Sequence, residues 1–206
     1  MDRDDAVLWF SATGMEFCIM LLDLVLYPNP ILKAVAEPVE HFDASLEKLV
    51  EDMAETMYAG KGVGLAAPQI GKSIRLFVVD TSAPEEPHAL KAYVNPKIIL
   101  KDAPCVWNEG CLSVPGIYRD VKTYAHVIIE AQDVKGAWFR EEAHELQAVA
   151  LLHEYAHLEG SVFLDRLNPV KRNMTKKFWA KRGKALAEET YKDTNLKYIL
   201  DEQAVK

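Results

Sequence analysis

The sequence has few of the features that mark secreted, membrane-bound or nucleic-acid-binding proteins. Its 206 residues include only three cysteines, and its formal net charge at pH 7 is -7. Three cysteines are too few for a disulfide framework, so we expect a reducing compartment in which a special cysteine serves as a ligand or a nucleophile. The negative charge argues against DNA or an anionic membrane surface as a general partner of the chain.

Long hydrophobic runs are also lacking. The apolar run Met15–Tyr27 is interrupted by Asp23 and is too short to cross a bilayer. Residues 1–5 are net acidic and no small-residue cleavage site follows, unlike in a signal peptide. We therefore expect a cytoplasmic protein with an N-terminal extension at residues 1–19, a single catalytic domain at 20–190 and a C-terminal tail at 191–206.

The apolar residues that are present predict both helices and strands. Apolar spacing indicates a helix between Asp43, its expected cap, and Gly60, and further helices over about 141–158 and 174–190. Strands are expected over residues 76–80, 92–100 and 124–131. Elements in this order, with short connections between the strands, predict an α+β domain with a mostly antiparallel sheet.

The strongest local signal is the run His153-Glu154-Tyr155-Ala156-His157. Histidines four residues apart on one helix lie on the same face, where both imidazoles can bind one metal ion. The intervening Glu154 then lies beside the ion, where it can take a proton from water. The alternative is a pair of core histidines that are satisfied by hydrogen bonds.

A catalytic ion usually has a third protein ligand. The candidates are Cys111, Cys105, His144, His126 and several carboxylates. Cys111 stands out because glycine and proline surround it in Glu109–Gly116, which is typical of a tight loop or strand end close to a ligand. A lone cysteine is more commonly a small buried apolar residue. That alternative stays open for Cys111 and is preferred for Cys105.

A glycine-rich segment, Gly60–Gln69, matches the dinucleotide-binding fingerprint in its residue types but not in its structural context. The fingerprint needs a strand before it and a helix after it, whereas here a helix precedes the segment and Pro68 interrupts it. We instead expect the backbone to lie close to a ligand, with Gln69 offering its amide.

Together, these segments resemble the peptide deformylase family, which has the same three motifs in the same order. The motifs are Gly62–Gln69, Glu109–Ser113 and His153–His157, and the flanking segments Leu26–Leu32 and Val94–Ile99 agree as well. The resemblance covers about residues 20–175. It implies mostly antiparallel sheets packed around a central helix that carries the His-Glu-x-x-His motif.

The resemblance also implies a reaction, the removal of the formyl group from the N-terminal formylmethionine of new proteins with release of formate. It implies one Fe²⁺ per chain, replaceable by Zn²⁺, Ni²⁺ or Co²⁺, although ligand chemistry alone favours zinc. The implied metal ligands are Cys111, His153 and His157. Glu154 is implied as the proton carrier, Gln69 and the N–H of Leu112 as oxyanion donors, and Gly62, Val63, Gly64 and Gly110 as substrate-binding residues.

Two positions depart from the family pattern. Leu152 stands where the family usually has glutamine, and Ala156 where it has aspartate. Losing residues that support metal ligands typically costs about 10–100-fold in affinity or activity. One alternative is therefore a weakly active or inactive relative. Another is a different His-Glu-x-x-His zinc peptidase, which would have its third ligand downstream and would keep its metal after Cys111→Ala.

Residues 171–184 form a basic segment within an acidic chain. The segment holds seven basic residues and no acidic one. A basic helix of this kind could contact ribosomal RNA near the exit of the nascent chain. The competing interpretation is a solvated helix face whose apolar residues, Phe178, Trp179 and Leu186, turn inward.

Overall fold

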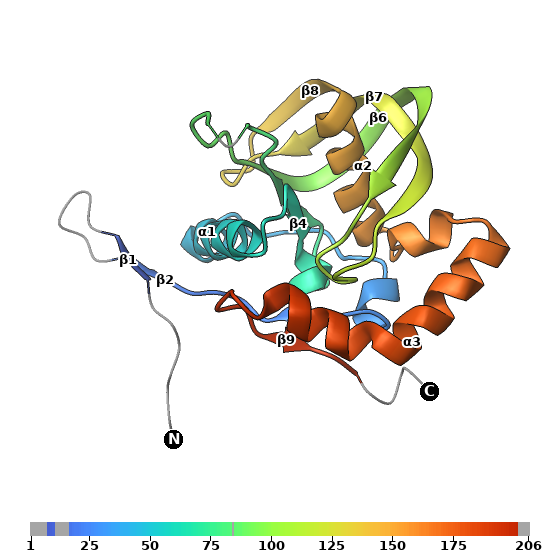
Figure 1. The fold of residues 1–206 in the computed structure, drawn as a ribbon. Coiled ribbons are helices and arrows are strands. Elements are labelled where there is room, and N and C mark those ends of the chain that lie inside the picture. The colour runs from blue at the N-terminus through green and yellow to red at the C-terminus, as the bar shows by residue number, and fades with distance from the viewer. Residues whose placement is uncertain (1–7, 11–16, 84, 202–206) are drawn as a thin grey trace.

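The computed structural model describes residues 8–10, 17–83 and 85–201, with only the backbone described for residues 8–10 and 17–19 (Figure 1). The predicted extension at residues 1–19 therefore lies mostly outside the described residues, and the predicted division into domains stays a prediction. The helices are α1 (Ala44–Ala59), α2 (Glu145–Leu158) and α3 (Pro169–Tyr191). The strands are β1 (Leu8–Phe10), β2 (Phe17–Ile19), β3 (Leu24–Val25), β4 (Gly64–Ala66), β5 (Leu76–Val79), β6 (Lys91–Glu109), β7 (Arg119–Gln132), β8 (Trp138–His144) and β9 (Tyr198–Ile199). Short 3₁₀ turns cover Pro30–Lys33, Ala67–Ile70 and Phe163–Arg166.

The main sheet has five strands in the order β4-β5-β6-β7-β8, and every neighbouring pair is antiparallel. The strands expected over 92–100 and 124–131 are both longer than predicted. Residues 99–106 of β6 are largely exposed, so no alternation of apolar and polar residues marks them as a strand. These residues pair with β7, and the pairing continues to Glu109↔Arg119. The sheet therefore extends to the loop that follows Glu109.

Helix α2 lies at the centre of the fold, against β4, β5, β7 and β8 (Figure 1). Leu151, His153, Glu154, His157 and Leu158 are all buried, because nearly the whole helix is enclosed. The predicted start near residue 141 is wrong. Residues 141–144 continue β8, where Ala143 pairs with Val127 of β7 and alternates with exposed neighbours. The α+β class with a central motif-bearing helix is confirmed.

Helix α1 begins as predicted, since the Asp43 side chain accepts hydrogen bonds from the N–H groups of Ser45 and Leu46. Gly60 caps its C-terminal end. Helix α3 starts earlier than predicted because Asn168 caps it and Pro169 occupies its first turn.

Helix α3 runs along the side of the molecule opposite β8 (Figure 1). It is fixed by Trp179, which is 2% exposed and whose Nε1–H donates to the Tyr27 carbonyl at 2.8 Å. Beyond α3, strand β9 pairs in parallel with β3. None of the helices within the described residues is both long enough and apolar enough to cross a membrane.

Candidate metal centre

Three side chains from two distant parts of the chain meet beneath the sheet. The sulfur of Cys111 and one ring nitrogen each of His153 and His157 lie within 4.8 Å of one another. The Cys111 Sγ is 3.3 Å from His157 Nε2. An ion bound about 2.3 Å from sulfur and about 2.0 Å from nitrogen allows separations below about 4.3 Å. The spacing between Cys111 and His157 therefore fits a shared ion.

The local backbone explains how Cys111 reaches the helix. Strand β6 ends at Glu109, and the chain turns at once, with the Val114 N–H donating to the Cys111 carbonyl at 2.9 Å. The ring of Tyr118 packs against Gly110, where an added Cβ would lie 2.5 Å from the ring, so a larger residue would have to displace it. The expected strand end around the cysteine is confirmed.

Glu109 orients the first histidine. Its Oε2 lies 2.8 Å from His153 Nδ1 and also accepts a hydrogen bond from Arg166. Burial raises the pKa of Glu109, but His153 and Arg166 outweigh this and hold it below its usual value. An ionised carboxylate only accepts hydrogen bonds, so Nδ1 carries the proton and the Nε2 lone pair of His153 is free for a metal.

Glu154 is 4% exposed, and its Oε2 has no hydrogen-bond partner among the described residues. Burial raises the pKa of Glu154 to about 7. Its Oε1 lies against Gly64, where an added Cβ would approach to 2.5 Å. The glycine of strand β4 therefore makes room for this carboxylate.

Gln69 is held so that its amide nitrogen points toward Cys111. Its Oε1 accepts from the Ala66 N–H at 2.8 Å, which leaves Nε2 facing Cys111 Sγ at 3.4 Å and Ser113 Oγ at 3.3 Å. The carbonyl of Leu112 accepts a hydrogen bond from the Tyr191 hydroxyl at 2.6 Å. The Leu112 N–H donates to no acceptor that the described part of the chain offers.

These groups open onto a cavity of about 250 Å³. The residues expected to bind substrate, Gly62, Val63, Gly64 and Gly110, all lie on its wall. Apolar side chains from several elements complete the lining, among them Leu112, Val114, Ile117, Leu146 and Val149. Such a cleft suits an apolar side chain next to a polar reacting group.

Three of the other candidate ligands lie elsewhere. Cys105 belongs to β6 and is not part of this group. His126 and His144 are on β7 and β8, in a separate cluster. Leu152 and Ala156 are half-buried positions of α2, the first directly before the motif and the second inside it.

Sequence reasoning missed several supporting residues. It did not assign roles to Glu109 or Ser113, although both stand inside a recognised motif. It also missed Arg166 and Tyr191, which come from the 3₁₀ turn after α2 and from the end of α3. No sequence signal links these two to the site, because they reach it only through the tertiary fold.

The donor set fits a transition-metal ion. One thiolate and two imidazoles suit iron, zinc, cobalt or nickel better than magnesium or calcium, which prefer oxygen ligands. The described residues therefore include a buried group able to hold one such ion, with Glu154 and Gln69 beside it.

Comparisons with known proteins agree with this geometry. Residues 21–173 match the family model described as polypeptide deformylase. The peptide deformylase of Syntrophobacter fumaroxidans is 45% identical over 164 residues, which cover 80% of this chain and 96% of the relative. That of Chromobacterium violaceum is 46% identical over 164 residues, covering 80% and 97%.

Solved structures give the same result. The crystal structure of a peptide deformylase from Legionella pneumophila superposes with a TM-score of 0.75 at 40% identity, covering 81% of this chain and 98% of that one. The peptide deformylase of Thermotoga maritima superposes with a TM-score of 0.68 at 37% identity, covering 72% and 99%. By its sequence motifs, its fold and these relatives, the chain belongs to the peptide deformylase family.

Proposed function

We propose that this protein is a metal-dependent hydrolase that removes the formyl group from the N-terminal formylmethionine of new proteins and releases formate. The observation that carries the proposal is the meeting of Cys111, His153 and His157 in one group, with Glu154 buried beside it. The family membership supports the same reaction.

Cys111, His153 and His157 would hold one ion per chain, Fe²⁺ in the native state, replaceable by Zn²⁺, Ni²⁺ or Co²⁺. When bound, the ion supplies Lewis acidity that activates water and polarises the formyl oxygen. The pairing of Glu109 with His153 supports the proposal, because it fixes the ring so that a lone pair faces the ligand group.

Glu154 takes the proton from the attacking water and delivers it to the departing amine. Its buried carboxylate, with one oxygen unpaired, is available for both steps. The Gln69 amide and the Leu112 N–H donate hydrogen bonds to the oxyanion that forms on the formyl group. One such donor typically contributes about 3–4 kcal/mol to the transition state.

The cavity accommodates the rest of the substrate. The backbone at Gly62–Gly64 and at Gly110 lies beside the reacting groups, where an extended peptide can approach closely. The apolar lining, including Val114 and Ile117, receives the methionine side chain. The substrate class is therefore a peptide that begins with formylmethionine and continues with further residues.

The departures at Leu152 and Ala156 do not remove a metal ligand. Among the described residues, the support of His153 comes from Glu109 at the end of β6. We therefore propose that the protein keeps its metal and its activity.

The direct test measures formate release from formyl-Met-Ala-Ser by anaerobically purified protein, together with the metal content. The wild-type protein should bind one ion at this site and release formate. The matched variant Glu154→Ala should keep the ion and lose activity, whereas Cys111→Ala should lose the ion as well. Metal-free, inactive wild-type protein, or a Cys111→Ala variant with full metal content, would contradict the proposal.

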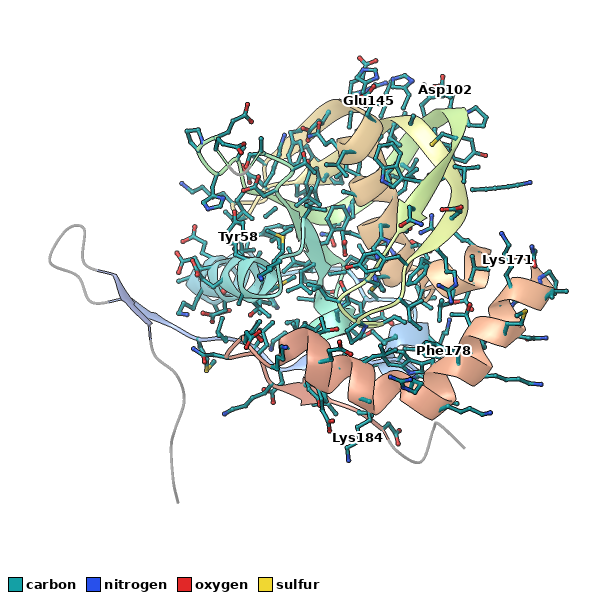
Figure 2. The ribbon with its side chains drawn as sticks, viewed as in Figure 1. Tyr58, Asp102, Glu145, Lys171, Phe178 and Lys184 are labelled. Atoms are coloured by element: carbon teal, nitrogen blue, oxygen red, sulfur yellow. The ribbon has the colours of Figure 1, made fainter. Side chains whose placement is uncertain are left out.

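We also propose that the protein works in the cytoplasm and contacts the ribosome through the basic residues 171–184 of α3. Lys171, Phe178 and Lys184 follow one another along this helix (Figure 2). Trp179 is buried but Phe178 is 44% exposed, so Phe178 does not turn fully inward as the competing interpretation expected. Ribosome pelleting that is absent, or unchanged by salt, would contradict the contact.

A further inference from the structure

A second cluster of histidines and carboxylates lies across three strands of the main sheet. The register places Asp102 of β6 opposite His126 of β7, and His126 opposite His144 of β8. Glu142 is two residues before His144, so both side chains point to the same face of the sheet. The four side chains therefore gather on one face although the sequence separates them by up to 42 positions.

Measured contacts join the cluster into one unit. His126 Nδ1 lies 2.6 Å from Asp102 Oδ1, and His126 Nε2 lies 2.8 Å from Glu142 Oε1. His144 Nε2 is 3.7 Å from the same Glu142 oxygen. The two imidazole rings stack in parallel, with centroids 4.7 Å apart and an interplanar angle of 4°. Because the lone pair of an imidazole lies in its ring plane, the exposed ring of His144 must rotate before it can share an ion with His126. Three ligand atoms, from His126, Glu142 and His144, thus lie within 4.8 Å of one another.

We propose that His126, Glu142 and His144 form a second site for a divalent transition-metal ion, with zinc as the best match. Two imidazoles and one carboxylate are a common donor set for zinc. Ions bound about 2.0–2.2 Å from such ligands allow ligand separations below about 4.2 Å. The distances of 2.8 and 3.7 Å measured at Glu142 meet this condition, and the ring nitrogens of the two histidines lie within 4.8 Å of each other, so a small rotation of the exposed His144 ring completes the site.

Asp102 completes the arrangement from behind. Its carboxylate accepts a hydrogen bond from the Nδ1–H of His126, which fixes the ring with Nε2 toward Glu142. A carboxylate–histidine pair of this kind orients the ring and raises its basicity toward a metal. In the metal-free protein a proton can bridge His126 Nε2 and Glu142, and the ion takes the place of that proton.

The cluster is accessible to an ion from solution. The side chains of Glu142 and His144 are 58% and 65% exposed, and that of His126 is 19% exposed. Asp102 lies at the far end of the sheet, near Glu145 at the start of α2 (Figure 2). Solvent can fill the remaining coordination positions.

The second site is separate from the catalytic centre. None of the four residues of the cluster lines the cavity that contains Cys111. An ion here would join β7 and β8 at the point where β8 passes into α2, because His144 is the residue immediately before that helix. The ion should therefore stabilise the fold without taking part in the reaction.

The test counts bound zinc by equilibrium dialysis or calorimetry, starting from protein that already holds one Zn²⁺ per chain at the catalytic centre. The wild-type protein should bind a second equivalent, and its melting temperature should rise with added Zn²⁺. His126→Gln and His144→Gln should each lose the second equivalent, while Asp102→Asn should bind it about 10–100-fold more weakly. Each variant is checked for folding by circular dichroism, and His144→Gln alters a side chain too exposed to be needed for packing.

Two controls separate this site from the catalytic one. The exposed His41 lies outside both clusters, so His41→Gln should still bind two equivalents. Cys111→Ala should lose the catalytic ion and keep the second one, whether or not formate release is observed. A wild-type protein that takes up only one ion would overturn the proposal, as would a second ion that persists unchanged in His126→Gln and His144→Gln.

Discussion

Replacing Gly64 with alanine should disable the catalytic carboxylate while leaving the metal ligands in place. An alanine Cβ at this position would lie 2.5 Å from Glu154 Oε1 and 2.8 Å from its Cγ. An ordinary contact needs about 3.4–3.5 Å, so the carboxylate must move by about 1 Å. Glu154 is 4% exposed and cannot swing into solvent.

A displacement of about 1 Å in a catalytic group can lower the rate about 100-fold, which corresponds to about 2.7 kcal/mol in the activation free energy. We expect kcat for formate release to fall by this factor. The metal content should not change, because the three atoms nearest to an added Cβ at Gly64 all belong to Glu154, which is not one of the metal ligands. The crowding should also lower the free energy of unfolding by about 1–3 kcal/mol.

A double-mutant cycle separates crowding of Glu154 from a general disturbance. Glu154→Asp shortens the side chain and should itself reduce kcat, but it also removes the Oε1 and Cδ positions that an alanine at position 64 would touch, and leaves only the Cγ position. The loss caused by Gly64→Ala should therefore be smaller in the Glu154→Asp background. Additive losses, full activity of Gly64→Ala, or a parallel loss of metal would each refute the reasoning.

Two further substitutions test the surroundings of the site, and a third tests how stability depends on pH. Glu109→Gln removes the charged partner of His153, and its metal affinity in a chelator competition should fall about 10–100-fold. Tyr191→Phe leaves the Leu112 carbonyl without its donor, and urea unfolding should show a loss of about 1–3 kcal/mol. Burial raises the pKa of Asp80, but the hydrogen bonds that it accepts outweigh burial and lower it from 3.8 to about 2. Because the folded pKa is the lower one, Asp80 stabilises the fold above pH 4 by about 2 kcal/mol and loses this as the pH falls toward 2. Unfolding curves of Asp80→Asn should lack that part of the pH dependence.

Local sequence signals were sufficient for the ends of α1 and for the histidine pair, although the cap Asn168 and Pro169, which are also local signals, were missed at the start of α3. Asp43 and Gly60 bound α1 as expected, because capping depends on the residue and its immediate neighbours. The spacing of His153 and His157 placed both rings on one side of a helix. Cys111, by contrast, could be assigned only by resemblance, because no local rule shows which loop approaches a helix 42 residues later.

The other errors share a cause, which is that exposed strands and tertiary partners leave little trace in the sequence. Residues 99–106 are paired with β7 yet have no buried face, so the length of β6 was underestimated. Residues 141–144 are Glu, Glu, Ala and His, a run compatible with either state, and strand pairing decided the outcome. Arg166 reaches Glu109 across 57 positions, a contact that single-sequence reasoning cannot supply.

The hydroxyl of Tyr191 and the pairing of β9 with β3 have a consequence for biosynthesis. The loop that presents Cys111 is braced by residues that are translated about 80 positions later, at the end of α3. A ribosome still covering those residues holds a chain whose catalytic loop lacks this brace. Newly made molecules should therefore gain full activity only after Tyr191 has emerged and docked.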